Sequence, residues 1–180
     1  MLKKVLFTAI LIACFSLTAI AQDFGYIGAE KCGMCHKSDK QGEQLKIWQG
    51  SKHANAFKTL QTPEAQEIAK GMGIADASKS EKCLVCHASG YNVDAKMLDK
   101  KFSVEDGVQC ETCHGAGSEY KSMKVMKSRE ESVKAGLKVW KNEEEIKAMC
   151  VTCHNEKSPT YKAFDFAKSY EKIKHNIPKK

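Results

Sequence analysis

The sequence predicts a mainly α-helical fold with extensive loops and little or no sheet. Signals for helix starts and ends delimit only short segments, and polar stretches separate them. Aromatic residues make up 8% of the chain and lysine occurs throughout it, so few large apolar side chains are available for a core. A short pattern, Cys-x-x-Cys-His, occurs four times. We expect the groups that these motifs bind to supply most of the core.

Cys-x-x-Cys-His is the sequence at which haem is attached covalently. The two thiols bond to the haem, and the adjacent histidine binds the iron. Four motifs predict four haem c groups packed together and wrapped by short helices, the small multihaem cytochrome c fold. The predicted attachment residues are Cys32, Cys35, Cys83, Cys86, Cys110, Cys113, Cys150 and Cys153. The predicted proximal iron ligands are His36, His87, His114 and His154.

Zinc sites and disulfide frameworks also use closely spaced cysteines. Neither explains why histidine follows the second cysteine all four times, because zinc and disulfides place no demand on that position. Outside the motifs only Cys14 remains, so no disulfide framework is left. The motifs therefore favour covalent haem.

The histidine supply is too small for four haems that each have two histidine ligands. Such haems would need eight histidines, and the chain has six. Only His53 and His175 lie outside the motifs. We expect both to bind iron as distal ligands, since neutral imidazole is a preferred donor to haem. At most two haems can then be bis-histidine, and the spacing does not reveal which.

Residues 1–21 have the pattern of an export signal peptide. Lys3 and Lys4 precede an apolar run that ends in small residues suited to cleavage. We expect a periplasmic or otherwise exported protein in which residues 22–180 form a single tetrahaem domain. The alternative is a lipid anchor at Cys14, which the apolar residues after Cys14 disfavour. The mature chain contains no apolar run long enough for a transmembrane segment.

The positive charge of the chain is largely offset by the expected haems. Residues 22–180 carry 27 basic and 22 acidic side chains, a formal charge of +5, and each haem brings a pair of propionates. This balance argues against nucleic acid as a partner. Lysines that face solvent or an acidic redox partner protein explain the composition better.

The first half of the chain carries signals for two short helical regions. Residues 44–58 have the apolar spacing of a helix that is interrupted near Gly50, with His53 beside the break. Thr62 predicts the N-cap of the next helix, because proline and an acidic residue follow it. Residues 73–82 are small and polar, which predicts a loop into the second motif.

Three further helices are predicted from their N-cap residues, Ser118, Asn142 and Asp165. The helix after Ser118 would carry Tyr120 and two methionines, and the helix after Asn142 would deliver the fourth motif from its end. The helix after Asp165 would place apolar residues on one face. That face would direct His175 toward the interior.

Several segments carry patterns that extend beyond the haem motif. They are Gly25-Tyr26-Ile27-Gly28-x-x-x-Cys32, Trp48-x-x-Ser51-x-His53-Ala54, residues 86–92 (CHASGYN), residues 107–119 (GVQCETCHGAGSE) and residues 150–155 (CVTCHN). Together they resemble the tetrahaem cytochrome c-554 family over essentially the whole mature chain. The resemblance implies a periplasmic electron carrier of helices and loops, with haems in parallel and perpendicular pairs. It also implies that His53 and His175 donate distal ligands; in the family's named carrier three haems are bis-histidine and one is five-coordinate.

The chain departs from the family pattern at Tyr120. Many relatives have histidine at this position, directly after Gly-x-Gly-Ser-Glu, so one distal ligand is missing here. Tyrosine can bind haem iron, but we favour a packing tyrosine with a hydrogen-bonded hydroxyl. Met123 and Met126 are the best remaining candidate ligands, although methionines on a helical face usually pack in a core. Lysine ligation, or a position that is open or closed by water, are the other outcomes.

Three functions are consistent with the sequence. We favour a carrier that relays electrons between redox partner proteins, with two haems that are not bis-histidine. The alternative is a reductase or sensor of nitric oxide or another nitrogen oxide at an open haem, and a docking subunit of a larger respiratory complex is a third possibility. No catalytic residue is assigned, because no substrate-binding constellation can be identified. A non-enzymatic carrier is therefore the expectation.

Overall fold

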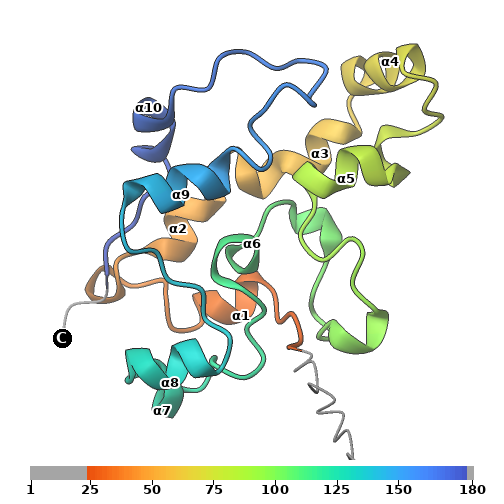
Figure 1. Ribbon diagram of the computed structural model, residues 1–180. Helices are drawn as coiled ribbons and strands as arrows, with labels where there is room; N and C mark the ends of the chain where they lie inside the picture. The colour runs from red at the N-terminus through yellow and green to blue at the C-terminus, as the bar shows by residue number, and fades with distance from the viewer. Residues whose placement is uncertain (1–23, 178–180) are drawn as a thin grey trace, which may run out of the picture.

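The protein is described by a computed structural model over residues 24–177. The predicted export signal and Cys14 lie outside the described residues. Residues 24–177 contain ten α-helices of four to nine residues and five 3₁₀ turns, joined by long loops (Figure 1). This part of the chain contains no strand, and its one isolated β-bridge pairs Tyr26 with Leu98. The predicted helical, loop-rich fold is confirmed.

The helices lie in small groups along the chain. The helix α1 contacts α2 and α6 near the centre, α3 contacts α4 and α5, and α7 and α8 form a separate hairpin (Figure 1). None of the helices in the described range is both long and apolar enough to cross a bilayer. Their bounds are α1 Ala29–Gly33, α2 Gln44–Gln49, α3 Ala56–Leu60, α4 Pro63–Gly71, α5 Glu81–His87, α6 Cys110–His114, α7 Met123–Met126, α8 Arg129–Lys134, α9 Glu143–Cys150 and α10 Phe166–Tyr170.

Three helix starts follow the predicted caps. The side-chain oxygens of Thr62, Asn142 and Asp165 each accept the backbone N–H three residues on, at 3.2, 2.9 and 3.0 Å. The predicted break after residue 49 is also present, because α2 ends there and His53 begins a 3₁₀ turn, His53–Asn55. Local capping chemistry therefore accounts for these boundaries.

The predicted helix capped by Ser118 is wrong. The Ser118 hydroxyl accepts the backbone N–H of Gly25, 93 positions away, at 2.9 Å. The helix α7 begins later and is capped by Ser122, so Tyr120 precedes it. A long-range hydrogen bond thus takes the side chain that a local cap would have used.

Two other boundaries also differ from the prediction. Residues 73–82 include a 3₁₀ turn, Ala77–Lys79, which forms because the Asp76 carboxylate accepts the Ser78 N–H at 2.9 Å. They also include the start of α5 at Glu81. The helix α10 ends at Tyr170, so His175 follows it in irregular chain and is exposed, which corrects its predicted place on an inward helical face.

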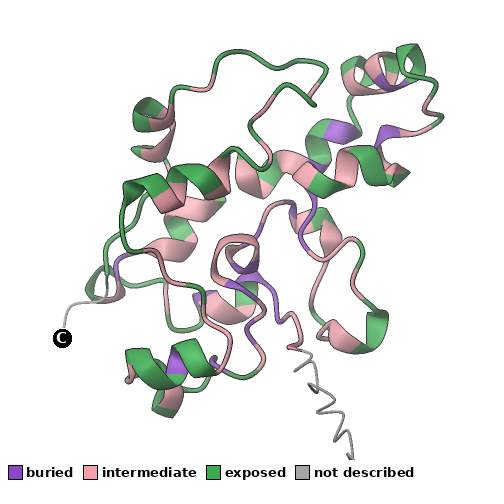
Figure 2. Cartoon of the chain, viewed as in Figure 1, coloured by how far each residue is buried: buried purple, intermediate pink, exposed green. Residues whose placement is uncertain are grey.

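Side chains alone form a small core (Figure 2). In residues 24–177 eight apolar residues are buried, and four of them are alanines. A chain of this length normally buries about two thirds of its unfolded surface. A hydrophobic cluster of Leu60, Ala69 and Ala77 packs directly against Cys83 of the second motif. The apolar contacts of this fold therefore gather beside the predicted attachment residues.

Candidate haem-binding sites

Each of the four motifs lies on a helical turn. The second motif ends α5, and the third forms α6. In the first motif the His36 N–H donates to the Cys32 carbonyl at 3.1 Å, and in the fourth the His154 N–H donates to the Cys150 carbonyl at 3.0 Å. A helical turn places residues three and four apart on one face. Two thiols and an imidazole can therefore reach the same side, and none of the eight motif cysteines forms a disulfide.

Two pairs of histidine rings lie at the separation that a shared iron requires. The His53 and His154 ring centroids are 6.1 Å apart, and those of His114 and His175 are 5.9 Å apart. Because an imidazole nitrogen binds a transition metal at about 2 Å, two rings on opposite sides of one ion have centroids about 6 Å apart. The structure thus brings His53 to the fourth motif and His175 to the third.

The surroundings of the motif histidines suit iron ligands. Partial desolvation by the surrounding chain lowers the pKa of all four paired imidazoles, including the largely exposed His154 and His175, which favours the neutral form that binds metal. His87 Nδ1 lies 2.8 Å from the Ala56 carbonyl, so the Nε2 atom is left for iron. The Phe164 ring stacks on the His154 ring at 4.5 Å. These contacts fix ring orientation, as outer contacts of metal-bound histidines do.

The motifs adjoin one another in a definite order. Burial, together with a neighbouring thiol, raises the pKa of both Cys86 and Cys113 to about 11. The thiol neighbours join the first motif to the third, the third to the fourth, and the fourth to the second: Cys32 with Cys110, Cys113 with Cys150, and Cys153 with Cys86. The paired histidines belong to the third and fourth motifs, which occupy the middle of this order.

The first and second motifs, at the two ends of the order, lack a histidine pair. All six histidines lie within residues 24–177, and neither His36 nor His87 forms a ring pair of this kind. Beside His36, the Gln44 Oε1 atom is buried without a hydrogen-bond partner among the described residues. That oxygen is placed to accept a ring N–H of a ligating histidine.

A cavity of about 580 Å³ lies beside the second motif. Cys83, Cys86 and His87 line one part of it, and α4 and residues 157–160 line others. Its volume is in the range of about 300–1,000 Å³ found for pockets that hold small molecules and cofactors. No histidine besides His87 lines it. The residues around this motif therefore fit a haem with a single histidine ligand.

Tyr120 is a buried packing residue. The residue is 7% exposed, and its hydroxyl donates to the Gly115 carbonyl at 2.6 Å. Burial raises the pKa of Tyr120, which disfavours the tyrosinate needed for iron ligation. The favoured interpretation of this residue is confirmed. Among the methionines, Met126 Sδ lies 3.9 Å from the Ser132 hydroxyl, whereas Met123 is 69% exposed.

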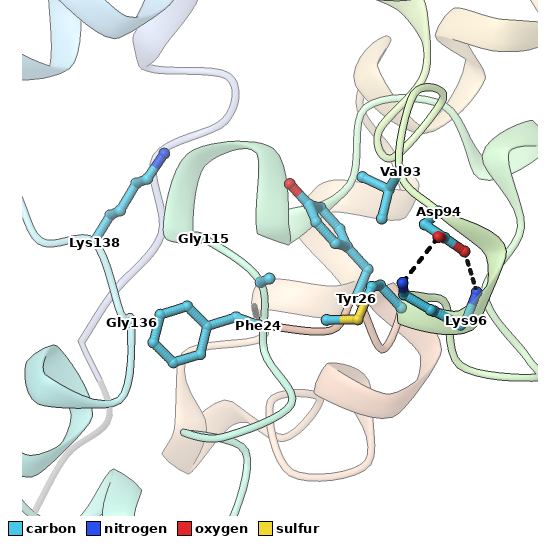
Figure 3. A pocket seen from close by; sticks show the side chains of 10 residues that line it. Phe24, Tyr26, Val93, Asp94, Lys96, Gly115, Gly136 and Lys138 are labelled. Carbon is cyan, nitrogen blue, oxygen red and sulfur yellow. Dashed lines mark hydrogen bonds and ion pairs between the residues drawn. The ribbon is translucent and has the colours of Figure 1, made fainter. Parts of the chain in front are cut away.

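A second, more open cavity of about 520 Å³ is lined in part by Gly115 and Ala116, which follow the third motif (Figure 3). Phe24 and Lys138 lie on one side of it, and Tyr26 and the Asp94–Lys96 ion pair lie on the other (Figure 3). Its lining includes none of the predicted site residues. This cavity therefore adds no ligand to the haem sites.

The described part of the chain, a sheet-free helical fold with haem-attachment motifs on helical turns, defines a c-type cytochrome, a class that carries electrons. Residues 31–115 match the family described as cytochrome c554 and c-prime. Cytochrome c-554 of Nitrosomonas europaea is 30% identical over 116 residues, which cover 61% of this chain and 47% of that relative. No solved structure matches the chain. The chain is thus similar to the cytochrome c-554 family over residues 31–115.

These matches cover only part of the chain and only part of the relative. The family match includes the first three motifs and His53 but ends before the fourth motif and His175. The chain spans less than half the length of the curated relative. The haem count and the axial ligands therefore depend on the residues of this chain.

Proposed function

We propose that this chain is a periplasmic tetrahaem c-type cytochrome that relays electrons between redox partner proteins. Four haem c groups would be attached at the four motifs of a single domain, residues 22–180, after removal of the signal at residues 1–21. Haem supplies one-electron redox chemistry when it is bound. The chain attaches the haems, donates axial ligands to them and limits access of water to them.

The histidine pairs carry this proposal. Separations of 6.1 and 5.9 Å support bis-histidine ligation at the fourth and third motifs, by His53 and His175 respectively. Iron closed by two histidines changes oxidation state with little rearrangement, which suits a relay. Because the four motifs adjoin in space in the order first, third, fourth and second, electrons can pass between the first and second haems through the two closed ones.

Three measurements on the oxidised and reduced holoprotein test the relay. Intact mass should equal that of the chain plus four haems, and electron paramagnetic resonance should show two bis-histidine low-spin haems. Carbon monoxide should bind the reduced protein at the first and second haems only. Four closed haems, or four open ones, would contradict the proposed ligand set.

The N-terminal residue of the exported protein should be Gln22, whereas an acylated Cys14 would establish the lipid anchor.

A reductase or sensor of nitric oxide or another nitrogen oxide is the second candidate function. The cavity beside His87 favours it, because a small ligand could reach an iron that has one protein ligand. Steady-state reduction of nitric oxide by the pre-reduced holoprotein would support an enzyme. Binding without turnover would support a sensor, and absence of binding would leave the carrier.

A further inference from the structure

Glu111 is a buried acid inside the third motif. It lies between Cys110 and Thr112 and is 1% exposed, which makes it one of the most buried side chains in the described residues. An acid is rarely buried to this degree without a compensating partner. Since the two positions between the motif cysteines make no bond to haem, the attachment chemistry does not require an acid there.

The Glu111 carboxylate accepts three backbone hydrogen bonds. Its Oε1 atom accepts the N–H groups of Ile27 and Gly117, at 2.9 and 2.7 Å, and its Oε2 atom accepts that of Gly28 at 2.8 Å. Both oxygens therefore act as acceptors, as those of an ionised carboxylate do. Burial raises the pKa of Glu111, and these three hydrogen bonds oppose that rise by favouring the ionised form. Within residues 24–177 no lysine, arginine or histidine forms an ion pair with Glu111.

Gln109, two residues before Glu111, also binds the segment that leads into α1. It is 2% exposed, its Oε1 atom accepts the Ala29 N–H at 2.8 Å, and its Nε2 atom donates to the Ser103 carbonyl at 2.8 Å. Three consecutive N–H groups, at residues 27–29, are thus held by two side chains of the third-motif segment. Figure 2 shows this buried junction where the chain before α1 meets α6.

The junction sets the place of the first motif. Residues 27–29 lead directly into α1, which carries Cys32, and the Cys32 thiol neighbours that of Cys110, next to Glu111. The side chain that holds the entrance of α1 therefore lies beside attachment cysteines of two haems. Its negative charge lies in a protein interior, where electrostatic interactions are stronger than in water.

We propose that Glu111 is a positioning residue that holds the first haem site against the third and, as a buried anion, lowers the reduction potentials of both haems. This inference rests on the proposed relay. A nearby negative charge stabilises ferric haem relative to ferrous haem, since ferric haem carries one more positive charge. Net charge and burial around a haem are levers by which a protein sets its potential.

Spectroelectrochemical titration of the holoprotein, with spin-state spectra that identify each haem, tests the inference. Glu111→Gln keeps the size of the side chain and removes its charge. It should raise the potentials of the first and third haems and leave the second and fourth unchanged. Glu111→Asp keeps the charge on a shorter side chain, so it should lower the free energy of unfolding while both potentials stay closer to wild type. Glu119→Gln is the matched control, because Glu119 is exposed in the loop that follows the same motif.

Three outcomes would overturn the inference: unchanged potentials in Glu111→Gln, an equal shift of all four haems, or Asp and Gln variants that behave alike. If Glu111→Gln does not accumulate as holoprotein, Gln109→Glu tests the same effect with the opposite sign and should lower the first and third potentials; an unchanged or raised pair would refute it. A wild-type mass with fewer than four haems would count against the relay itself, whereas a wild-type relay with an inert Glu111 would count against this inference alone.

Discussion

Each of the two histidines outside the motifs should bind the iron of one particular haem. We expect His53→Ala to convert the fourth haem from low spin to high spin, and His175→Ala to convert the third, because each removed ring is paired with the histidine of that motif. Each single variant should bind one more carbon monoxide per reduced molecule than wild type, and the double variant two more. Electron paramagnetic resonance and ligand titration measure these changes. A variant that stays fully low-spin at its haem would show that another residue is the ligand.

Tyr120, unlike these two histidines, should not bind iron. Tyr120→Phe should leave all four haem spectra unchanged, because the hydroxyl is bonded to a backbone carbonyl. It should lower the free energy of unfolding by about 1–2 kcal/mol, since the buried Gly115 carbonyl loses its donor. Urea unfolding followed by circular dichroism gives the energy, and the absorption spectrum gives the ligand state. A new high-spin signal would instead identify Tyr120 as an iron ligand.

Among the helices, α9 depends on its cap for the presentation of the fourth motif. Asn142→Ala removes the acceptor of the Glu145 N–H and should cost about 1 kcal/mol of stability, the usual value for a lost N-cap. Asn142→Asp is the control, since aspartate caps equally well and its charge suits a helix N-terminus. We expect the Ala variant alone to unfold at lower urea concentration, with both variants retaining four haems. Equal stability of the Ala and Asp variants would show that the cap does not stabilise α9.

The helix starts that sequence could predict are those set by local chemistry. The side chains of Thr62, Asn142 and Asp165 each accept a hydrogen bond from the backbone N–H three residues on, so the local sequence is enough to predict these helix starts. Ser118 bonds across 93 positions, and only the folded chain reveals its partner. The α10 boundary was missed because an apolar spacing continues beyond Tyr170 although the helix does not.

The same distinction between local and long-range features applies to the candidate haem sites. The attachment cysteines and proximal histidines follow from a contiguous motif, and the shortage of distal ligands follows from counting histidines. The pairing of His53 with His154, 101 positions away, could not be predicted, because it depends on how loops bring distant turns together. Glu111 was missed because its neighbours in sequence give no sign of burial, and its partners lie before the first motif.

At the scale of the whole molecule, the missing ligands fall at the ends of the motif order. The third and fourth motifs hold the paired histidines and lie in the middle, while His36 and His87 lie at the two ends. Closed haems in the middle suit transfer within the protein, and haems with one histidine at the ends can have potentials and ligands of their own. The shortage is thus consistent with a relay and with small-molecule binding at its ends.

The fold should depend on haem as a whole. Residues 24–177 bury eight apolar side chains, half of them alanine, which leaves little hydrophobic free energy against the conformational entropy of so many loops. We expect a variant with all eight motif cysteines replaced by serine to show low helicity and no cooperative unfolding in urea, by far-ultraviolet circular dichroism. The wild-type holoprotein, handled identically, should unfold cooperatively. A cooperative transition in the serine variant would mean that side-chain packing and backbone hydrogen bonds suffice, and that haem binds to a scaffold already formed. Loss of a single motif should have a graded effect, largest for the third motif, because α6 holds the N-terminal segment through Glu111 as well as attaching a haem.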